Sequence, residues 1–272
     1  MEIDLLGKDI LLQEAIDSAN PGDVIILDNK TYYEKVEVKT KNLTIKGREL
    51  SCVAFDACNQ SIIPTMMGGD GIKKFGTTGS STFRVLEGAD GFNCKNVKFL
   101  NYFKRSEGDQ GQAVAFKSEI SDLYMENCKF ISQQDTLYID FGSNNKIVNC
   151  YIEGDVDFIF GSANCLFDNC EIKAVNVVGR AYFTAPDTYE YNNIGFVFEN
   201  CKFISSEGLH SKLGRAWYPS GARVKVYPKL TINNSTFIGD IDPSLVQMHV
   251  GDPDLHTLVL NNCILNGVRI DK

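Results

Sequence analysis

Short apolar runs separated by polar residues fill the chain from residue 24 onward. Runs such as 24–27, 35–38 and 43–45 are rich in Val and Ile, and Asn, Gly and Lys residues punctuate them. This pattern is typical of short β-strands that are joined by turns. We therefore expect β-structure along most of the chain.

A single short helix is predicted close to the start of the chain, over residues 9–20. Apolar residues recur there at the spacing of one helical face, at Leu12, Ala15, Ile16 and Ala19. Asp9 is a suitable N-cap, and the sequence Asn-Pro-Gly at residues 20–22 ends the helical pattern. We expect residues 1–22 to cap the N-terminal end of the β-structure, and we expect no further helix.

A phrase of the form apolar-x-apolar-x-Asn-Cys-x-apolar recurs along the chain, as in LYMENCKF, FVFENCKF and LVLNNCIL. With its variants it places asparagines 20 to 34 residues apart, at Asn96, Asn127, Asn149, Asn169, Asn200, Asn234 and Asn262. Such a period indicates stacked structural units. Because each unit is short and its runs are β-type, we predict an all-β fold, a right-handed parallel β-helix forming one domain over residues 1–272. Residues 221–272 are expected to form its last, divergent coils.

The repeat also predicts what fills the coils. Inward asparagine side chains can hydrogen-bond to their copies in the coils above and below. The cysteine beside each asparagine is small enough to fill a buried slot, which predicts a ladder of Cys128, Cys150, Cys170, Cys201 and Cys263. Nine cysteines are an odd number and include no CxxC pair, so neither a disulfide framework nor a zinc site is indicated. An antiparallel sandwich with short strands is the structural alternative.

Composition and charge exclude several classes of protein. The 272 residues are 43% hydrophobic and 23% charged, as in an ordinary globular protein. The net charge of −8, without a basic block, argues against a nucleic-acid partner. No apolar run reaches the roughly 18 residues of a membrane span, so no membrane association is expected. Residues 1–6 lack a signal-peptide pattern, which predicts a cytoplasmic protein as written, or a secreted one if a signal has been removed.

Two aspartates occupy equivalent positions in consecutive units of the repeat. Asp135 lies eight residues after Asn127, and Asp157 lies eight residues after Asn149. On stacked coils their carboxylates would lie about 5 Å apart, so neither should ionise independently of the other. Such a pair can divide into an acid or base and an anionic nucleophile. A pair of solvated surface aspartates is the simpler explanation of the spacing alone.

Four phrases of the chain resemble, in order, motifs of the pectin methylesterases (pectinesterases, carbohydrate esterase family 8). They are GQAVAF at 111–116, QQDTLY at 133–138, GDVDFIFG at 154–161 and LGRAW at 213–217. The opening LQEAIDSANPGDVIIL also resembles that family, so the similarity extends from about residue 12 to about residue 220. The resemblance implies a pectinesterase-like β-helix that removes methyl esters from galacturonate units and releases methanol.

The resemblance also implies roles for individual residues. Asp157 matches the nucleophile that forms an acyl-enzyme, and Arg215 matches the arginine that orients it and lowers its pKa. Asp135 matches the general acid and base, whose pKa must lie above that of Asp157. Gln112 and Gln134 match the amides that stabilise the oxyanion. The structural alternative for Arg215 is a surface salt bridge. For Gln112 and Gln134 it is a buried glutamine with a purely structural role.

Three further residues match the family's substrate cleft. Trp217, the only tryptophan of the chain, matches a residue that stacks on a sugar ring, although a core tryptophan is the structural alternative. Phe160 and Thr82 match positions that line the cleft. Ala216 departs from the family, which commonly has proline there, and the similarity fades after residue 220.

Other functions remain open from the residues alone. A retaining glycoside hydrolase of pectin could use paired carboxylates on the same fold, although glutamine amides suit an acyl oxyanion better than a cationic centre. A relative acting on a different ester and a non-catalytic carbohydrate-binding solenoid are further alternatives. A Ser-His-Asp esterase is disfavoured because GxSxG is absent, and the three histidines are interpreted as ordinary surface or loop residues, His210, His249 and His256.

The expected partners follow from this interpretation. We expect methylated homogalacturonan or oligogalacturonide as substrate, with highly methylated pieces favoured because a −8 protein repels polyanions. A proteinaceous inhibitor is a further partner that the family suggests, and we expect a monomer. No clustered acids suggest a Ca²⁺ site, so neither a metal nor another cofactor is predicted.

Overall fold

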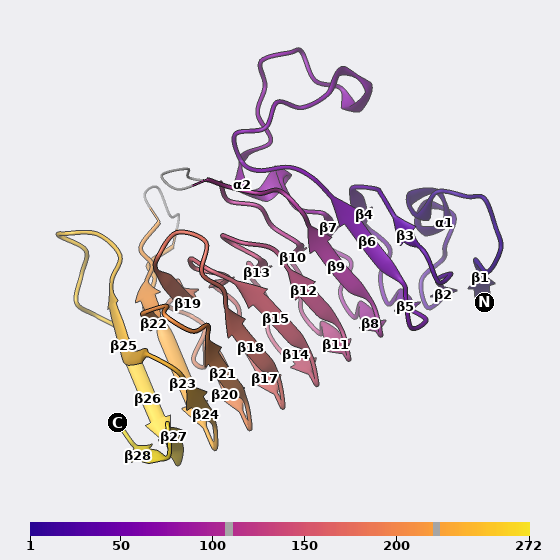
Figure 1. The fold of residues 1–272 in the computed structure, drawn as a ribbon. Helices are drawn as coiled ribbons and strands as arrows, with labels where there is room; N and C mark the ends of the chain where they lie inside the picture. Colours follow the sequence, from indigo (N-terminus) through magenta and orange to yellow (C-terminus); the bar gives the residue numbers. More distant parts are fainter. Residues whose placement is uncertain (107–110, 220–223) are drawn as a thin grey trace.

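The computed structural model describes residues 1–106, 111–219 and 224–272, and these form a parallel β-helix of three sheets (Figure 1). Residues 221–223 of the segment predicted to form the last coils lie outside the described residues. From β2 to β25 the chain visits the three sheets in turn, so that each of these coils contributes one strand to each sheet. The predicted fold class is confirmed.

The first sheet has ten strands. In spatial order they are β1 (Glu2–Asp4), β2 (Val24–Ile26), β5 (Thr44–Lys46), β8 (Asn93–Lys95), β11 (Tyr124–Glu126), β14 (Asn145–Val148), β17 (Cys165–Asp168), β20 (Phe196–Glu199), β23 (Lys229–Asn233) and β26 (Thr257–Asn261).

The second sheet also has ten strands. They are β3 (Thr31–Tyr32), β6 (Cys52–Phe55), β9 (Lys98–Asn101), β12 (Lys129–Ile131), β15 (Tyr151–Gly154), β18 (Glu171–Ala174), β21 (Lys202–Ser205), β24 (Thr236–Ile238), β27 (Cys263–Leu265) and β28 (Val268–Ile270). The final pair, β27 and β28, is antiparallel and ends the solenoid with a hairpin.

The third sheet has eight strands and carries the residues of the site described below. They are β4 (Val36–Val38), β7 (Phe83–Val85), β10 (Phe116–Ser118), β13 (Leu137–Ile139), β16 (Ile159–Gly161), β19 (Ala181–Pro186), β22 (Ser211–Ala216) and β25 (Ile241–Gln247).

The repeated asparagines form the corner between the first and second sheets. All seven have a positive φ, between 50° and 60°, which is the left-handed conformation that Asn tolerates better than most residues. Their side chains are exposed and do not point inward as predicted, because the left-handed turn directs them away from the core. They still bond between coils on the outer surface, where Asn169 Nδ2 donates to Asn149 Oδ1 at 2.6 Å.

Cysteines and phenylalanines fill the interior of the coils. All nine cysteines are free and buried, and the predicted cysteine ladder is among them. Phenylalanines of neighbouring coils stack on one another, as Phe99 does on Phe130 with ring centroids 5.5 Å apart. Burial of large aromatic side chains from coil to coil therefore stabilises a fold whose strands are only two to seven residues long.

The N-terminal helix is shorter than predicted. Helix α1 (Leu12–Asp17) begins after Leu11, and Asp9 does not cap it. The carboxylate of Glu34, from the following coil, accepts hydrogen bonds from the backbone N–H groups of Leu12 and Gln13 at 2.8 and 3.0 Å. A side chain distant in sequence therefore supplies the cap that Asp9 was expected to provide.

The expectation of no further helix was wrong. The connection between β6 and β7 contains a 3₁₀ helix, η1 (Thr65–Met67), and a one-turn helix, α2 (Gly76–Gly79). In Figure 1 this connection projects from the solenoid as a long arm, and α2 lies at its base. Among the described residues, no helix has the length and apolar character needed to cross a bilayer.

Candidate active site

Asp135 and Asp157 lie at neighbouring positions of consecutive coils, as the repeat predicts. Strands β13 and β16 pair in parallel with Leu137 opposite Ile159, and the Asp135 N–H donates to the Val156 carbonyl at 3.1 Å. Both aspartates precede their strands by two residues and have a positive φ, 65° and 53°. The predicted register of the two acids is therefore confirmed.

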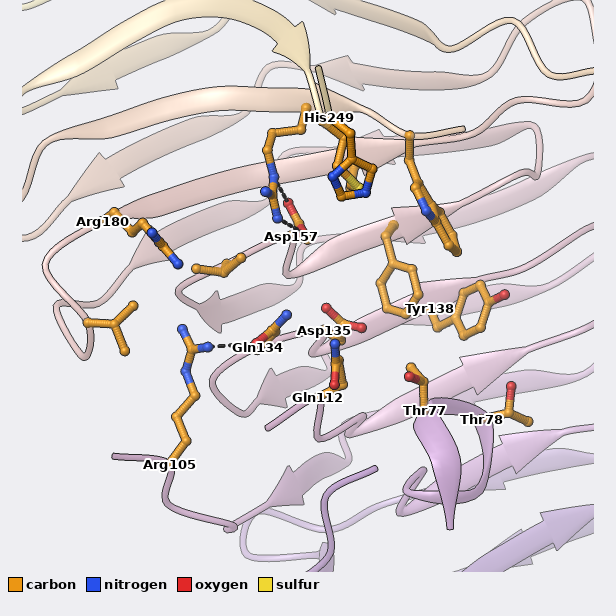
Figure 2. Close-up of a pocket in the computed structure, with 17 residues that line it drawn as sticks. Thr77, Thr78, Arg105, Gln112, Gln134, Asp135, Tyr138, Asp157, Arg180 and His249 are labelled. Carbon is orange, nitrogen blue, oxygen red and sulfur yellow. Dashed lines mark hydrogen bonds and ion pairs between the residues drawn. The ribbon is translucent and has the colours of Figure 1, made fainter. Parts of the chain in front are cut away.

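The two acids lie in a cleft of about 650 Å³ on the outside of the third sheet (Figure 2). Of the residues predicted for the site, those that line the cleft are Gln112, Gln134, Asp135, Asp157, Phe160, Arg215 and Trp217. Asp135 and Asp157 are only 8% and 7% exposed, so both are desolvated without being sealed from the cleft.

Thr82 does not line the cleft, and its predicted role is therefore corrected. Its side chain is completely buried, and its hydroxyl donates to the Leu100 carbonyl at 3.1 Å. The threonines that line the cleft are Thr77 and Thr78, on the short helix α2. The prediction that Thr82 lines the cleft was therefore wrong, and the arm that brings Thr77 and Thr78 to the cleft was not predicted.

Arg215 binds Asp157 through both of its carboxylate oxygens. Arg215 Nε donates to Asp157 Oδ1 at 2.9 Å, and Nη2 donates to Oδ2. The guanidinium also lies over the ring of Tyr182, 4.4 Å from its centroid. Ala216, in place of the family's usual proline, is buried in β22 and pairs with Gln247, so the ladder itself holds this segment. The arginine therefore fixes the direction of the Asp157 carboxylate.

Burial and the neighbouring charges separate the two carboxyl groups. Burial raises the pKa of Asp157, and the hydrogen bonds and charge of Arg215 oppose that rise without overcoming it. Arg215 thus acts in the expected direction, although the net pKa is not lowered. The pKa of Asp135 is raised well above its usual value, first by burial and then by the negative charge of Asp157. Of the two acids, Asp135 therefore holds its proton more strongly.

Gln112 and Gln134 form a second pair across consecutive coils. A parallel bridge joins them, and the Ala113 N–H donates to the Gln134 carbonyl at 3.0 Å. Figure 2 shows both side-chain amides beside Asp135. Gln134 Oε1 accepts from Arg105 Nη1 at 2.6 Å. Arg105 was not predicted, because it belongs to none of the four motifs.

Three aromatic rings line one side of the cleft. Tyr138 and Phe160 stack with ring centroids 4.1 Å apart, and Phe160 lies 5.9 Å from Trp217 at an interplanar angle of 60°. Phe160 is only 3% exposed and supports the other two rings, whereas Trp217 is partly exposed. Trp217 is thus a cleft residue and not a core tryptophan. Tyr138 could have been proposed from its place in the QQDTLY motif.

Two of the three histidines differ in their position relative to the cleft. His249, interpreted as an ordinary surface or loop residue, lines the cleft next to Met248, after β25. His210 instead pairs with Asp240 on the surface at 3.0 Å. Within the part of the chain that the structure describes, no group of three or more His, Cys, Asp or Glu residues could hold a metal ion.

Comparisons with known proteins identify the family. A family model described as Pectinesterase matches residues 9–269, which is nearly the whole chain. The chain belongs to the pectinesterase family. It is 32% identical over 236 residues to Probable pectinesterase 8 of Arabidopsis thaliana, covering 81% of this chain and 56% of that protein. It is 31% identical over 174 residues to Pectinesterase B of Pectobacterium parmentieri, covering 57% of this chain and 44% of that one.

Solved structures of pectin methylesterases share the fold. The enzyme from Erwinia chrysanthemi superposes with a TM-score of 0.82 at 24% identity, over 100% of this chain and 90% of that one. The enzyme from carrot gives a TM-score of 0.78 at 22% identity, over 98% and 83% of the two chains. The chain spans about half the length of the first pectinesterase relatives that it matches.

Proposed function

We propose that the protein is an aspartyl esterase that removes methyl esters from galacturonate units of methylated homogalacturonan or oligogalacturonides. The observation that carries this proposal is the asymmetry of the acid pair. Arg215 binds Asp157 through both oxygens, while Asp135, in register on the adjacent coil, has the more strongly raised pKa. Membership of the pectinesterase family supports the substrate class. A pectin methylesterase of the same fold has been solved in complex with a hexasaccharide.

In the first step, Asp157 acts as nucleophile. A carboxylate oxygen of Asp157 attacks the ester carbonyl carbon, and the bond from that carbon to the methoxy oxygen breaks. Asp135 donates its proton to the methoxy oxygen, so methanol leaves and a mixed anhydride remains on Asp157. The raised pKa of Asp135 suits this role, because the group must still hold a proton when substrate binds.

In the second step, water hydrolyses the mixed anhydride. The Asp135 carboxylate takes a proton from a water molecule, which attacks the acyl carbon. The bond from that carbon to Asp157 then breaks, which restores the Asp157 carboxylate and the proton on Asp135. The amides of Gln112 and Gln134 lie where they can donate to the oxyanion that forms in both steps.

The remaining cleft residues suit a sugar ester. Trp217, which is partly exposed, offers a ring face to the apolar face of a galacturonate unit, and Met248 offers an apolar contact for a methyl group. Amide donors next to the acid pair favour acyl transfer over glycosidic cleavage, because an oxocarbenium centre is cationic and gains nothing from them.

The experiment that tests this function measures methanol and new reducing ends from the same methylated oligogalacturonide. We expect methanol release, in proportion to the carboxylate formed, without new reducing ends. New reducing ends would support the retaining glycoside hydrolase instead. Neither product, from any methylated oligogalacturonide up to polymer length, would refute the proposal.

A further inference from the structure

Arg105 joins three consecutive coils beneath one side of the cleft. It follows β9, lines the cleft and is 8% exposed. Its Nε and Nη2 donate to Asp155 Oδ2 at 3.1 and 2.6 Å, and its Nη1 donates to Gln134 Oε1 at 2.6 Å. Its backbone N–H donates to Gln133 Oε1 at 2.8 Å. One guanidinium therefore connects the coil that carries Gln134 with the coil that carries Asp157.

Asp155 lies within the GDVDFIFG motif but takes no part in the proposed reaction. It lies two residues before Asp157 and is completely buried, so its carboxylate does not reach the cleft. Its Oδ1 accepts from the Val156 N–H, and its Oδ2 is occupied by Arg105. A buried carboxylate held at both oxygens fixes the position of the guanidinium that it binds.

The chemistry of arginine then decides how the Gln134 amide is turned. A guanidinium has donors only, so the atom of Gln134 that faces Arg105 must be the carbonyl oxygen. The amide nitrogen is consequently directed into the cleft, beside Asp135 (Figure 2). A glutamine without such a partner can turn its oxygen toward the cleft, where it would repel an oxyanion.

Gln112 provides the contrast within the same site. Its Oε1 is buried, and among the described residues it has no hydrogen-bond partner. Of the two glutamines, Gln134 alone has its amide oxygen bound by a charged donor in the part of the chain that the structure describes. The two glutamines, equivalent by position, thus differ in how firmly their donors are oriented.

We propose that Arg105 and Asp155 are positioning residues that hold the Gln134 amide with its N–H groups directed at the oxyanion. This inference rests on the proposed function, in which Gln134 stabilises that oxyanion. Because the oxyanion exists only in the transition state and the intermediate, loss of the orientation lowers kcat and leaves KM nearly unchanged. A merely structural ion pair would affect folding stability without this separation of the two constants.

The variants are chosen to avoid an uncompensated buried charge. Arg105→Met alone would leave the Asp155 carboxylate buried and unpaired, so the main test is the double variant Arg105→Met/Asp155→Asn. The second variant is Arg105→Lys. It keeps the positive charge, but its single ammonium group lacks the planar guanidinium that donates to Asp155 and Gln134 together. The matched control is Arg48→Met/Asp4→Asn, which removes an arginine–carboxylate pair of the N-terminal coils, remote from the cleft.

For the double variant we expect kcat for methanol release to fall roughly 10- to 100-fold, with KM within about twofold of wild type. Arg105→Lys should give an intermediate loss, and the Arg48 control should keep the wild-type kcat. Adding Gln134→Ala to the double variant should cost little more, because both changes remove the same interaction. An unchanged kcat in both Arg105 variants, or losses that multiply with Gln134→Ala, would overturn the proposal.

A measurement without substrate separates this proposal from the proposed function. The side-chain ¹⁵NH₂ signal of Gln134, assigned by its loss in Gln134→Ala, should report a rigid amide in wild type and a mobile one in both Arg105 variants. An amide equally mobile in wild type would overturn the positioning role. If wild-type protein releases no methanol, the proposed function fails, and the amide signal still decides whether Arg105 orients Gln134.

Discussion

The carboxyl groups of Asp135 and Asp157 share one cleft because their strands pair in register, with Leu137 opposite Ile159. Only Asp157 is bound by Arg215, and the charge of Asp157 contributes to the raised pKa of Asp135. Two identical side chains on adjacent coils thereby become chemically different. The proposed division into nucleophile and acid depends on this difference.

The first prediction concerns the proton of Asp135. Asparagine has nearly the same shape but no acidic proton, so Asp135→Asn should slow methanol release by roughly 10²- to 10⁴-fold. Thermal stability should not fall at neutral pH, because the variant removes a buried acid whose ionised form is unfavourable. Initial rates and thermal melting together check this prediction. A variant that keeps more than a tenth of the wild-type rate would contradict the role of Asp135.

The second prediction concerns the fork of Arg215. Lysine keeps the charge but cannot bind both oxygens of Asp157, so Arg215→Lys should lower kcat by roughly 10-fold or more. In wild type, the hydrogen bonds of Arg215 oppose the rise in the pKa of Asp157. The variant weakens them, so the pKa of Asp157 rises further and the acid limb of the pH profile should move to higher pH. A pH profile of kcat/KM measures both effects. A shift of that limb to lower pH would show that Arg215 does not stabilise the ionised Asp157.

The third prediction uses the single tryptophan as a reporter. Because Trp217 lines the cleft and the chain has no other tryptophan, intrinsic fluorescence should change when a methylated oligogalacturonide binds. Titration of an Asp157→Ala protein avoids turnover during the measurement. Trp217→Phe should keep most of the affinity and Trp217→Ala should lose roughly 10-fold. Equal affinity of the alanine variant would exclude stacking on this ring.

The repeated Asn-Cys phrase predicts some features of the fold and not others. Wherever it occurs, the Asn-Cys phrase marks a left-handed corner followed by a buried slot, so it predicts the stacking and the register of the two acids. It does not record the direction of the asparagine side chains, which the positive φ turns outward. It also does not record the helix cap from Glu34, because that contact joins different coils.

The site residues that lie within sequence motifs were predicted correctly. Those that only long-range contacts bring to the cleft were missed. Asp135, Asp157 and Arg215 lie within motifs, and the structure brings them together. Thr82 was placed wrongly because the arm that brings Thr77 and Thr78 to the cleft has no repeat signal. His249 lies in the segment where the family resemblance fades. Long-range contacts such as these leave no pattern at the spacing of a strand or a coil.

The fourth prediction concerns Asp187, a buried acid outside the proposed chemistry. Burial raises the pKa of Asp187 to about 7, the Asp140 charge adds to that rise, and the Ser162 hydroxyl opposes it. Between the usual value of 3.8 and about 7, the folded protein keeps a proton that the unfolded chain loses. The free energy of unfolding should therefore fall as pH rises through this window, by roughly 4 kcal/mol at most, and then level off.

Asp187→Asn isolates this contribution from the other buried acids. Asparagine does not titrate, so urea unfolding of the variant should lose less stability between pH 4 and pH 7 than wild type does. Asp140→Asn is a useful comparison, because it removes the neighbouring charge and should shift the window to lower pH. Parallel stability curves for wild type and Asp187→Asn would show that Asp187 does not hold its proton in the fold.

The measurement that tests the central claim most directly is the rate of methanol release by Asp157→Ala on a methylated oligogalacturonide. Asp240→Ala, which removes an exposed carboxylate on the surface, is the matched control and should keep the wild-type rate. Without the nucleophile no acyl-enzyme can form, and we predict that methanol release by the folded Asp157→Ala protein falls to the rate of the uncatalysed reaction. Release by this variant at a rate close to wild type would contradict the account.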